Sequence, residues 1–278
     1  MNYSTQQIRI AILDLYEGHE NQGMRCLREI INQWGEANGL DVECNEFDVR
    51  RVNAVPDLSY DIFISSGGPG SPLDTVDSEW EKQYFNWLQS VEDFNNDSFN
   101  SNKKRVFFIC HSFQLACRHY KIGNVCKRVS TSFGVFPIHP IGDVENEQVF
   151  DGLNNPFYVV DSRDYQVIEP NYESIHAMGA SILAIEKNRP HVPYERAIMA
   201  VRFNEYFIGT QFHPEADAVG MRMYLLRDDK KENVIKNHGE PKWHSMIEQL
   251  QDPEKILYTY SHILPNFLNS AIGEMVLS

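Results

Sequence analysis

The first 110 residues alternate between short apolar runs and longer segments in which apolar residues recur every three or four positions. The apolar runs are rich in β-branched and aromatic residues, as buried strands are: IRIAILDLY (8–16), VECNEFDV (42–49), DIFISS (61–66) and RVFFIC (105–110). Residues 20–37 and 78–94 have the spacing of amphipathic helices. Strands that alternate with crossover helices predict βαβ units and an α/β fold with a mostly parallel sheet.

The pattern changes near residue 124, where strand-like runs follow one another with Gly, Pro and Asn between them. These runs are VCKRVS, FGVFPI, FYVV, AIMAVRF and YFIGTQF. We expect them to extend the sheet with antiparallel strands. The last two runs are separated only by Asn204 and Glu205, a spacing that suits a two-residue hairpin.

Residues 217–278 have the pattern of a helical tail. Apolar residues of its last segment recur at helical spacing, namely Ile256, Leu257, Tyr260, Ile263 and Leu264. Such a stripe needs a partner surface, and three are open: the chain's own sheet, a subunit interface, or a site over which the tail forms a lid. Pro265 is expected to break or kink the helix and leave the stretch from Asn266 as a separate element.

Composition and charge narrow the class of protein. The chain has 278 residues, 42% of them hydrophobic, enough for one large α/β domain or two small ones. Its formal net charge of -14 repels phosphate backbones and anionic lipid surfaces, so we expect neither nucleic acid nor membrane as a partner. The N-terminus has no signal-peptide pattern, and no apolar stretch approaches the roughly 18 residues of a membrane span.

The five cysteines are Cys26, Cys44, Cys110, Cys117 and Cys126. An odd number in a chain that needs no disulfide staples favours a reducing cytoplasmic location. No CxxC pair and no His, Cys or carboxylate cluster has the spacing of a zinc site. We therefore expect no metal and no cofactor.

Cys110 stands at the junction of the strand RVFFI and a helix that begins near Ser112. A nucleophile at such a junction is lifted above the sheet edge and lies against a helix N-terminus, which favours a thiolate. An isolated cysteine is more typically a small core residue, so this position alone does not assign a function.

Two further segments carry chemistry that would complement a cysteine nucleophile. His213 follows a strand and precedes Pro214, and Glu215 lies two residues on, where its carboxylate can orient the imidazole. The turn SSGGPGSP at 65–72 can bring a backbone N–H close to a developing oxyanion. It lacks the GK[ST] of a phosphate-binding loop. Alone, each segment is as well explained by an ordinary loop.

Together, in this order and at comparable separations, the three segments resemble the class I glutamine amidotransferases. That family has a GGP oxyanion loop, a GxCxGxQ elbow and a terminal HPE, on a flavodoxin-like open sheet. The resemblance covers roughly residues 8–216, so we expect residues 1–216 to form an amidotransferase-like domain. Residues 217–278 would be a helical extension packed on that domain.

The resemblance implies a role for specific residues of this chain. Cys110 would be the nucleophile, His213 the base and Glu215 the third member of the triad. The backbone N–H groups of Gly68 and His111 would form the oxyanion hole. Substrate contacts would come from Gln114, which matches the elbow glutamine, and from the segment DSRDYQV through Ser162, Arg163 and Asp164. The His111 side chain could line the site or point to solvent.

The elbow departs from the family pattern at both glycines. Phe108 occupies the first position and Ser112 the second. Small residues are preferred there because the tight turn brings neighbouring backbone against these positions. Phe108 therefore requires a pocket of its own or a shifted turn.

Three functional readings follow. The first is a glutaminase that forms a cysteinyl thioester and releases ammonia to a separate synthetase subunit, since the chain shows no acceptor domain of its own. The second is a γ-glutamyl hydrolase or peptidase acting on other γ-glutamyl amides. The third is a binding protein that has lost turnover, for which Phe108 is the strongest argument.

Overall fold

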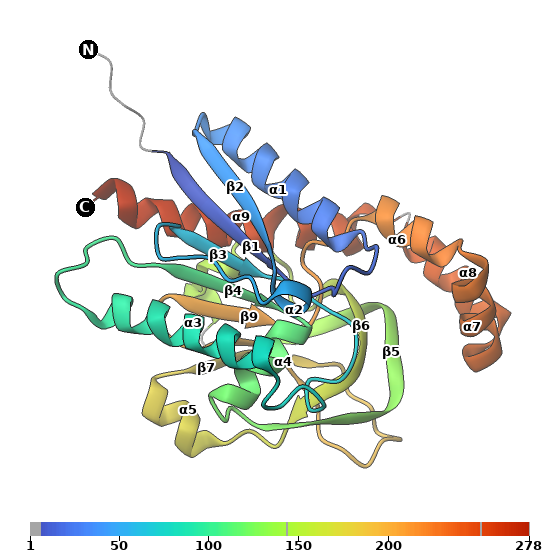
Figure 1. Cartoon of the computed structure of the whole chain (residues 1–278). Helices are drawn as coiled ribbons and strands as arrows, with labels where there is room; N and C mark the ends of the chain where they lie inside the picture. The colour runs from blue at the N-terminus through green and yellow to red at the C-terminus, as the bar shows by residue number, and fades with distance from the viewer. Residues whose placement is uncertain (1–6, 143, 251, 278) are drawn as a thin grey trace.

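The chain forms one mixed β-sheet with helices on both faces (Figure 1). The computed structural model describes residues 7–142, 144–250 and 252–277. Within them the sheet has nine strands in the order β2-β1-β3-β4-β9-β8-β7-β5-β6. Their bounds are β1 Ile8–Asp14, β2 Val42–Asp48, β3 Ile62–Ser65, β4 Arg105–Ile109, β5 Asn124–Pro140, β6 Phe157–Ile168, β7 Ser181–Glu186, β8 Ile198–Arg202 and β9 Phe207–Thr210.

Five strands form the parallel half. Four of them are those that the alternating pattern predicted; the fifth, β9, was expected in the antiparallel extension but pairs with β4 in parallel. β1 pairs with β2 and β3, β3 with β4, and β4 with β9, all in parallel. Every residue of β3 and β4 is buried, which explains why these strands read as unbroken apolar runs. Because parallel strands end at the same edge, the segments that follow β1, β3, β4 and β9 meet there.

The antiparallel extension is confirmed, with differences in detail. The runs VCKRVS and FGVFPI are one strand, β5, whose register against β6 shifts between Lys127 and Ser132. The gap between the runs is therefore a bulge and not a loop. β7 joins β5 to β8 and was not predicted. The β8–β9 hairpin exists, but its connection spans 203–206 and not two residues.

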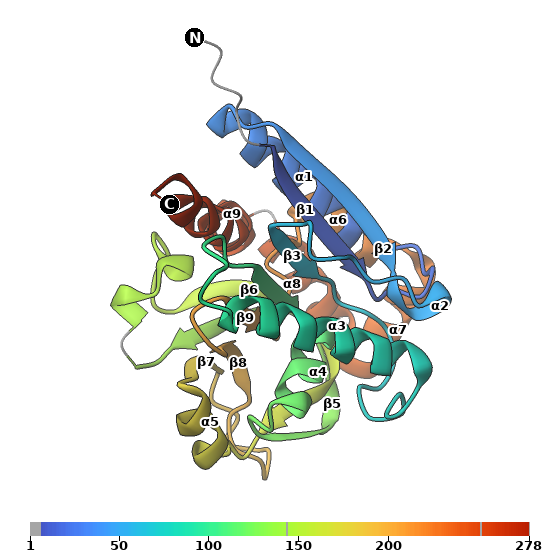
Figure 2. The ribbon, with the colours of Figure 1, turned by 60° about the vertical axis from the view of Figure 1, so that its left-hand side comes forward.

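Helices cover both faces of the sheet (Figure 2). α1 (Gly23–Asn38) and α9 (Pro253–Leu277) lie on one face, and α3 (Glu79–Asn96) and α4 (His111–His119) on the other. The two predicted helices correspond to α1 and α3. The shorter elements are α2 Val49–Val52, α5 Tyr172–Met178, α6 Ala218–Leu225, α7 Asp228–His238, α8 Glu240–Gln249 and the 3-10 turns Val144–Asn146 and Gln148–Phe150.

The prediction that a separate element begins at Asn266 is wrong. α9 continues through Pro265, which lies inside the helix. A proline removes one backbone donor, but Ile263, Leu264, Phe267 and Leu268, on both sides of it, are buried in the core. Packing of this apolar face outweighs the local cost of the proline.

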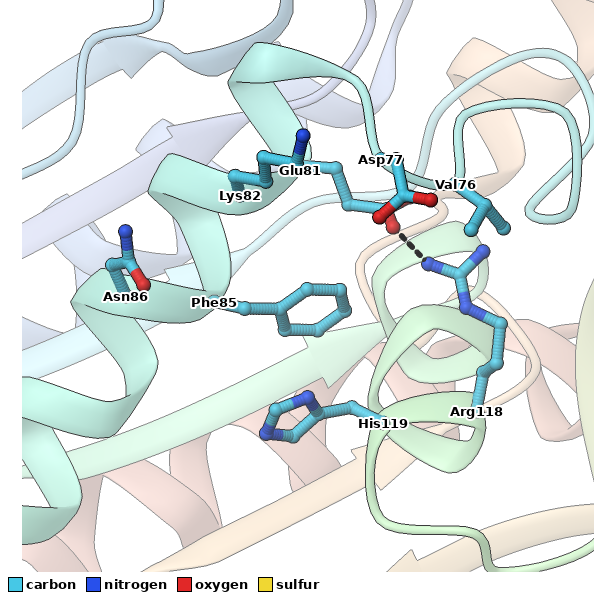
Figure 3. A pocket seen from close by; sticks show the side chains of 8 residues that line it. All are labelled: Val76, Asp77, Glu81, Lys82, Phe85, Asn86, Arg118 and His119. Atoms are coloured by element: carbon cyan, nitrogen blue, oxygen red, sulfur yellow. Dashed lines mark ion pairs between the residues drawn. The ribbon is translucent and has the colours of Figure 1, made fainter.

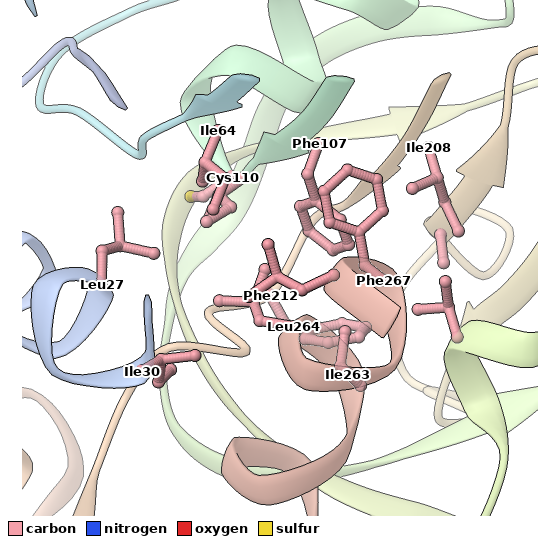
Figure 4. Packing of buried hydrophobic residues seen from close by; sticks show 14 of the residues in the cluster. Leu27, Ile30, Ile64, Phe107, Cys110, Ile208, Phe212, Ile263, Leu264 and Phe267 are labelled. Atoms are coloured by element: carbon pink, nitrogen blue, oxygen red, sulfur yellow. The ribbon is translucent and has the colours of Figure 1, made fainter. Parts of the chain in front are cut away.

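The core lies in two layers, one on each face of the sheet. On the first face Phe107 of β4 packs edge-on against Phe267 of α9 at 5.1 Å between ring centroids, and Leu27 of α1 belongs to the same cluster (Figure 4). Cys110 lies at the rim of this cluster, at the end of β4. None of the helices in the described part of the chain combines the length and apolar character needed to cross a membrane.

Candidate active site

A cleft of about 670 Å³ opens along the edge where the parallel strands end. Tyr16 follows β1, Gly68 follows β3, Cys110 follows β4 and His213 follows β9, and all four line the cleft. Strand order thus brings together residues that are far apart in the sequence. The predicted nucleophile, base and oxyanion loop occupy one site.

Cys110 has the backbone of a sharp strand-to-helix turn. Its φ of 48° and ψ of -94° are a strained conformation for a residue with a Cβ. Hydrogen bonds to neighbouring residues stabilise this strained conformation. The Cys110 N–H donates to the Thr210 carbonyl at 2.8 Å. The Ser112 hydroxyl accepts from the Ile109 N–H at 2.8 Å and donates to the Ser65 carbonyl at 2.7 Å. Ser112 therefore tightens the elbow from within and ties it to β3.

Phe108 has a pocket of its own. It is fully buried, and its ring meets Phe203 and Phe207 edge-on at 5.6 and 6.2 Å between centroids. The residue that faces it on β9 is Gly209. A Cβ on Gly209 would stand 2.9 Å from the Phe108 Cβ and 3.0 Å from the Phe113 ring. Gly209 on β9 has no side chain and therefore leaves the space that the Phe108 side chain on β4 occupies. In relatives with a glycine at the elbow, that space would be left on β4 instead.

His213 and Glu215 form a directly bonded pair. Nδ1 of His213 lies 2.8 Å from Oε1 of Glu215, whose side chain is 2% exposed. Burial alone would lower the pKa of His213, but the Glu215 carboxylate and the hydrogen-bonded Cys110 sulfur outweigh it, and the pKa is raised well above its ordinary value. With Nδ1 committed to Glu215, Nε2 remains for the thiol.

The Gly-rich turn presses against both the β1 loop and the histidine. A Cβ on Gly68 would stand 2.4 Å from the Leu15 carbonyl oxygen, and one on Gly67 2.9 Å from His213 Cε1. Arg50, with a side chain 8% exposed, donates to the Pro69 carbonyl at 2.7 Å and pairs with Glu17 at 2.9 Å. A side chain at either glycine would displace the turn, so backbone alone faces the cleft at these positions.

The elbow glutamine forms a chain of contacts with a second glutamine that the sequence did not single out. Gln114 Nε2 donates to Gln211 Oε1 at 3.1 Å, and Gln211 Nε2 approaches the Cys110 sulfur at 3.8 Å. Gln211 directly follows β9, two residues before His213. Its place just after a strand, like that of Cys110 after β4, was a usable signal for it.

The segment 162–164 borders the cleft in three different ways. The Ser162 carbonyl faces the Cys110 thiol at 3.7 Å, and exposed Asp164 accepts from Thr131 Oγ1 at 2.5 Å. The Arg163 guanidinium is 1% exposed and paired with Asp161 at 2.9 Å and Glu186 at 3.4 Å. That geometry does not support a direct side-chain contact between Arg163 and a substrate. We interpret Arg163 as a residue that positions this segment.

The His111 side chain does not point to solvent, since the residue is 2% exposed. Burial lowers the pKa of His111 to about 3, with a smaller contribution from Arg50 and Arg118. Its Nε2 has no hydrogen-bond partner among the described residues. The imidazole is thus neutral at ordinary pH, and His111 is among the residues that line the cleft.

The other cysteines lack the position of Cys110. Burial raises the pKa of Cys26 to about 12 and that of Cys44 to about 11, and it pushes the pKa of Cys117 well above the ordinary value. These three therefore remain thiols at ordinary pH. Cys126 lies on β5, and its sulfur accepts from Gln166 Nε2 at 3.7 Å.

The outer wall of the cleft comes from the helical tail. The residues of the tail that line it include Met221 and Tyr224 of α6, Arg227 just before α7 and Val234 within α7, alongside Thr131 and Phe133 of β5. The Phe133 and Tyr224 rings lie 5.4 Å apart. The apolar stripe of the final segment, on α9, packs on the chain's own sheet, which was the first of the three arrangements left open for it. That α6 and α7 line the cleft was not predicted.

A second depression, of about 440 Å³, lies between α3 and α4 (Figure 3). Phe85 stacks on His119 with ring centroids 4.4 Å apart, and Arg118 pairs with Glu81. Neither Cys110 nor His213 lines it. Among the described residues, no group of three or more His, Cys, Asp or Glu side chains is arranged to hold a metal ion.

The sequence and the fold both match known proteins. The family described as "Glutamine amidotransferase class-I" matches residues 23–232, and no curated protein sequence matches the chain significantly. A glutamine amidotransferase from Thermotoga maritima is 15% identical with a TM-score of 0.64, covering 95% of this chain and 98% of its own. The corresponding values for one from Methylobacillus flagellatus are 14%, 0.61, 96% and 95%.

A further structural match is the CTPS glutaminase domain of Trypanosoma brucei, crystallised with bound acivicin. It is 15% identical with a TM-score of 0.57, covering 96% of this chain and 94% of its own. These similarities show the flavodoxin-like fold.

Proposed function

This chain belongs to the class-I glutamine amidotransferase family, and we propose that it hydrolyses the γ-carboxamide of glutamine through a thioester on Cys110. The observation that carries the proposal is the Cys110–His213–Glu215 arrangement beside the Gly-rich turn in one cleft. A strained elbow, a buried carboxylate on the base and a side-chain-free turn are the parts that acyl transfer requires.

In the first half-reaction, the proton of the Cys110 thiol passes to Nε2 of His213, whose raised pKa favours the imidazolium, and the sulfur then attacks the γ-carbonyl carbon. Glu215 holds Nδ1–H and stabilises the imidazolium. The carbonyl oxygen becomes an oxyanion that the N–H groups of Gly68 and His111 would stabilise. When the C–N bond breaks, His213 returns its proton to the departing nitrogen, and ammonia leaves behind a γ-glutamyl thioester.

The second half-reaction repeats this chemistry with water. His213 accepts a proton from the water that attacks the thioester carbonyl, and the same N–H groups stabilise the second oxyanion. The C–S bond then breaks, the sulfur recovers its proton from His213, and glutamate is released. Cys110 is thereby restored.

Three variants test these roles. Cys110→Ala should release no ammonia from glutamine and form no thioester by mass spectrometry. His213→Ala removes the proton carrier, whereas Glu215→Gln keeps an orienting group of similar shape and should retain more rate. Full activity of Cys110→Ala together with inactivity of Cys117→Ala would contradict the proposal, as would negligible effects at both His213 and Glu215.

The size of the cleft favours a second candidate, hydrolysis of substituted γ-glutamyl amides. Met221, Tyr224 and Phe133 line the cleft in addition to the triad, and we propose that they would accept the substituent of the leaving amine. The two substrates are separated by measuring ammonia from glutamine and the chromophore from γ-glutamyl-p-nitroanilide. A kcat/KM greater for the anilide would favour the second candidate.

If glutamine is the substrate, we propose that a separate synthetase receives the ammonia. Co-purification of a tagged chain from its native cells, followed by a glutamine-dependent synthesis assay, tests this partner. The expected cytoplasmic location stays a prediction.

A further inference from the structure

The glycines of the Gly-rich turn leave the orientation of one of its peptide planes unrestrained by side chains of their own. Neither Gly67 nor Gly68 carries a Cβ, so the peptide plane between them can rotate with little steric resistance. One orientation presents the Gly68 N–H to the cleft, and a flipped plane presents the Gly67 carbonyl oxygen instead, which would repel an oxyanion. An active site of this kind needs something that holds the plane.

The side chain of Ser66 lies where it can hold this plane. Its hydroxyl donates to the Gly67 carbonyl at 2.8 Å and accepts from the Leu15 N–H at 2.9 Å. The residue is 1% exposed, and its own N–H donates to the Leu13 carbonyl at 3.0 Å. The Ser66 hydroxyl thus both donates and accepts a hydrogen bond, and the contacts with Leu13 of β1 and Leu15 just after it fix its position.

The bond to Gly67 determines where the Gly68 N–H points. Among the described residues the one cis peptide is Asn155–Pro156, so the Gly67–Gly68 peptide is trans. In a trans peptide the C=O and the N–H point in opposite directions. With the Gly67 oxygen held at Ser66, the Gly68 N–H is held facing away from that hydroxyl.

We propose that Ser66 is a positioning residue that keeps the oxyanion hole formed before substrate arrives. The inference rests on the proposed function, because a fixed Gly68 donor matters only if an oxyanion forms at Cys110. Ser66 does not touch the substrate. It acts through the peptide plane that provides one of the two donors.

The chain offers a matched control one residue away. Ser65 is also fully buried, but its hydroxyl faces Tyr84 at 2.9 Å and has no contact with the Gly67–Gly68 peptide. Ser65→Ala removes a buried hydroxyl without loosening that plane. Ser66→Thr and Ser66→Val form a second matched pair, because the two side chains have the same shape and differ in the hydroxyl.

The test compares these variants in glutamine hydrolysis and in two alkylations of Cys110. Iodoacetamide reacts by direct displacement and needs no oxyanion hole, whereas the chloroketone analogue of glutamine first forms a tetrahedral adduct that does. Removal of an oxyanion donor costs roughly 10²–10³ in kcat, so Ser66→Ala, which frees the donor without deleting it, should cost about tenfold or more. KM and the iodoacetamide rate should not change, and the chloroketone rate should fall with kcat.

The control variants decide what such a loss means. Ser65→Ala should keep the wild-type kcat, and Ser66→Thr should be faster than Ser66→Val in both hydrolysis and chloroketone reaction. Equal kcat in the Thr and Val variants overturns the role of Ser66, as does a parallel fall in the iodoacetamide rate. A wild-type protein that neither releases ammonia nor reacts with the chloroketone overturns the proposed function itself, and this inference with it.

Discussion

The helical tail contains two regions that follow one another in the chain and differ in what they contact. α9 places Ile263, Leu264 and Leu268 in the main core, where it lies beside α1, and the Trp34 indole donates to Asn269 at 2.8 Å. α6, α7 and α8 form a smaller cluster against β5 and β6, around Leu225 and Trp243.

Because the two regions contact different parts of the molecule, we expect α9 to determine the stability of the fold and α6–α8 to affect access to the site. α9 completes a face of the sheet that would otherwise be exposed, so the fold depends on it. The α6–α8 segment lines the outer cleft and leaves Val219, Met223 and Leu226 exposed. A truncation after Asp217 would remove both regions at once, so single substitutions are the sharper test of a tail that is core in one part and cleft wall in the other.

The largest expected effect is that of Leu268→Ala. Leu268 is fully buried in the main core, and its truncation should cost about 3 to 5 kcal/mol of unfolding free energy, the upper part of the range for buried leucines. Urea denaturation measures the loss. KM of the folded fraction should stay at the wild-type value, because Leu268 does not line the cleft. A loss below about 1 kcal/mol would contradict the core role of α9.

The same substitution in the other region should behave differently. Leu225 is also fully buried, but its cluster is small and can relax, so Leu225→Ala should cost about 2 kcal/mol, the low end of the range. It should raise KM for the substrate, since α6 carries the cleft residues Met221 and Tyr224. Steady-state kinetics alongside denaturation gives both values, and an unchanged KM would remove α6 from the substrate site.

The unfolding free energy measured as a function of pH tests the pairing of His213, which lies at the sheet edge and outside the tail. Pairing raises the pKa of His213, so the stabilisation is complete below the ordinary histidine pKa of about 6.5 and is lost as pH rises through the raised value. Each unit of that shift corresponds to about 1.4 kcal/mol. The difference in unfolding free energy between wild type and His213→Gln should therefore shrink with increasing pH. A difference that grows instead would contradict the pairing.

His111 should show the opposite sign. Its pKa is lowered to about 3 by burial, so the unfolded chain takes up a proton that the folded chain refuses. Between about pH 6.5 and 3 the wild type should lose stability relative to His111→Asn by up to about 1.4 kcal/mol per pH unit. Parallel pH curves for the two proteins would show that the imidazole is accessible in the folded state.

The smallest effect is expected on the outer face of α6. Met223 is 56% exposed, so Met223→Ser should change the unfolding free energy by no more than about 0.5 kcal/mol and leave kcat and KM unaltered. Leu226→Ser is a matched companion, at 52% exposure. A loss above about 1 kcal/mol at either position would mean that this face is packed in solution and that the tail is more uniform than described here.

The parallel half of the sheet and the site that follows it could be predicted because both depend on local patterns. Buried strands read as apolar runs, and the segments at Gly68, Cys110 and His213 follow such runs directly. That Gly68 and Cys110 meet follows from the direction of the parallel strands they terminate. His213 follows a strand that was expected to be antiparallel, and only the family resemblance implied that it joins them. In these parts of the molecule each functional segment directly follows a buried strand, and such a strand is recognisable in the sequence as an apolar run.

The parts that could not be predicted depend on partners distant in the chain. One of the two carboxylate partners of Arg163, Glu186, lies on a strand that no pattern marked, and Pro265 is tolerated because of packing on both sides of it. A long-range ion pair leaves no period in the sequence. The proline shows a local rule outweighed by tertiary contacts, which a window of neighbours cannot reveal.

The pairing of Phe108 with Gly209 bears on how relatives of this chain are recognised. The two residues face each other on β4 and β9, and there is room for a large side chain on only one of them. The steric requirement at the elbow therefore applies to the pair and not to the β4 residue alone. We expect these positions to covary among homologues, with a large side chain on one strand accompanied by glycine on the other. A search pattern that demands glycine at the elbow alone would discard proteins whose glycine lies about a hundred residues downstream.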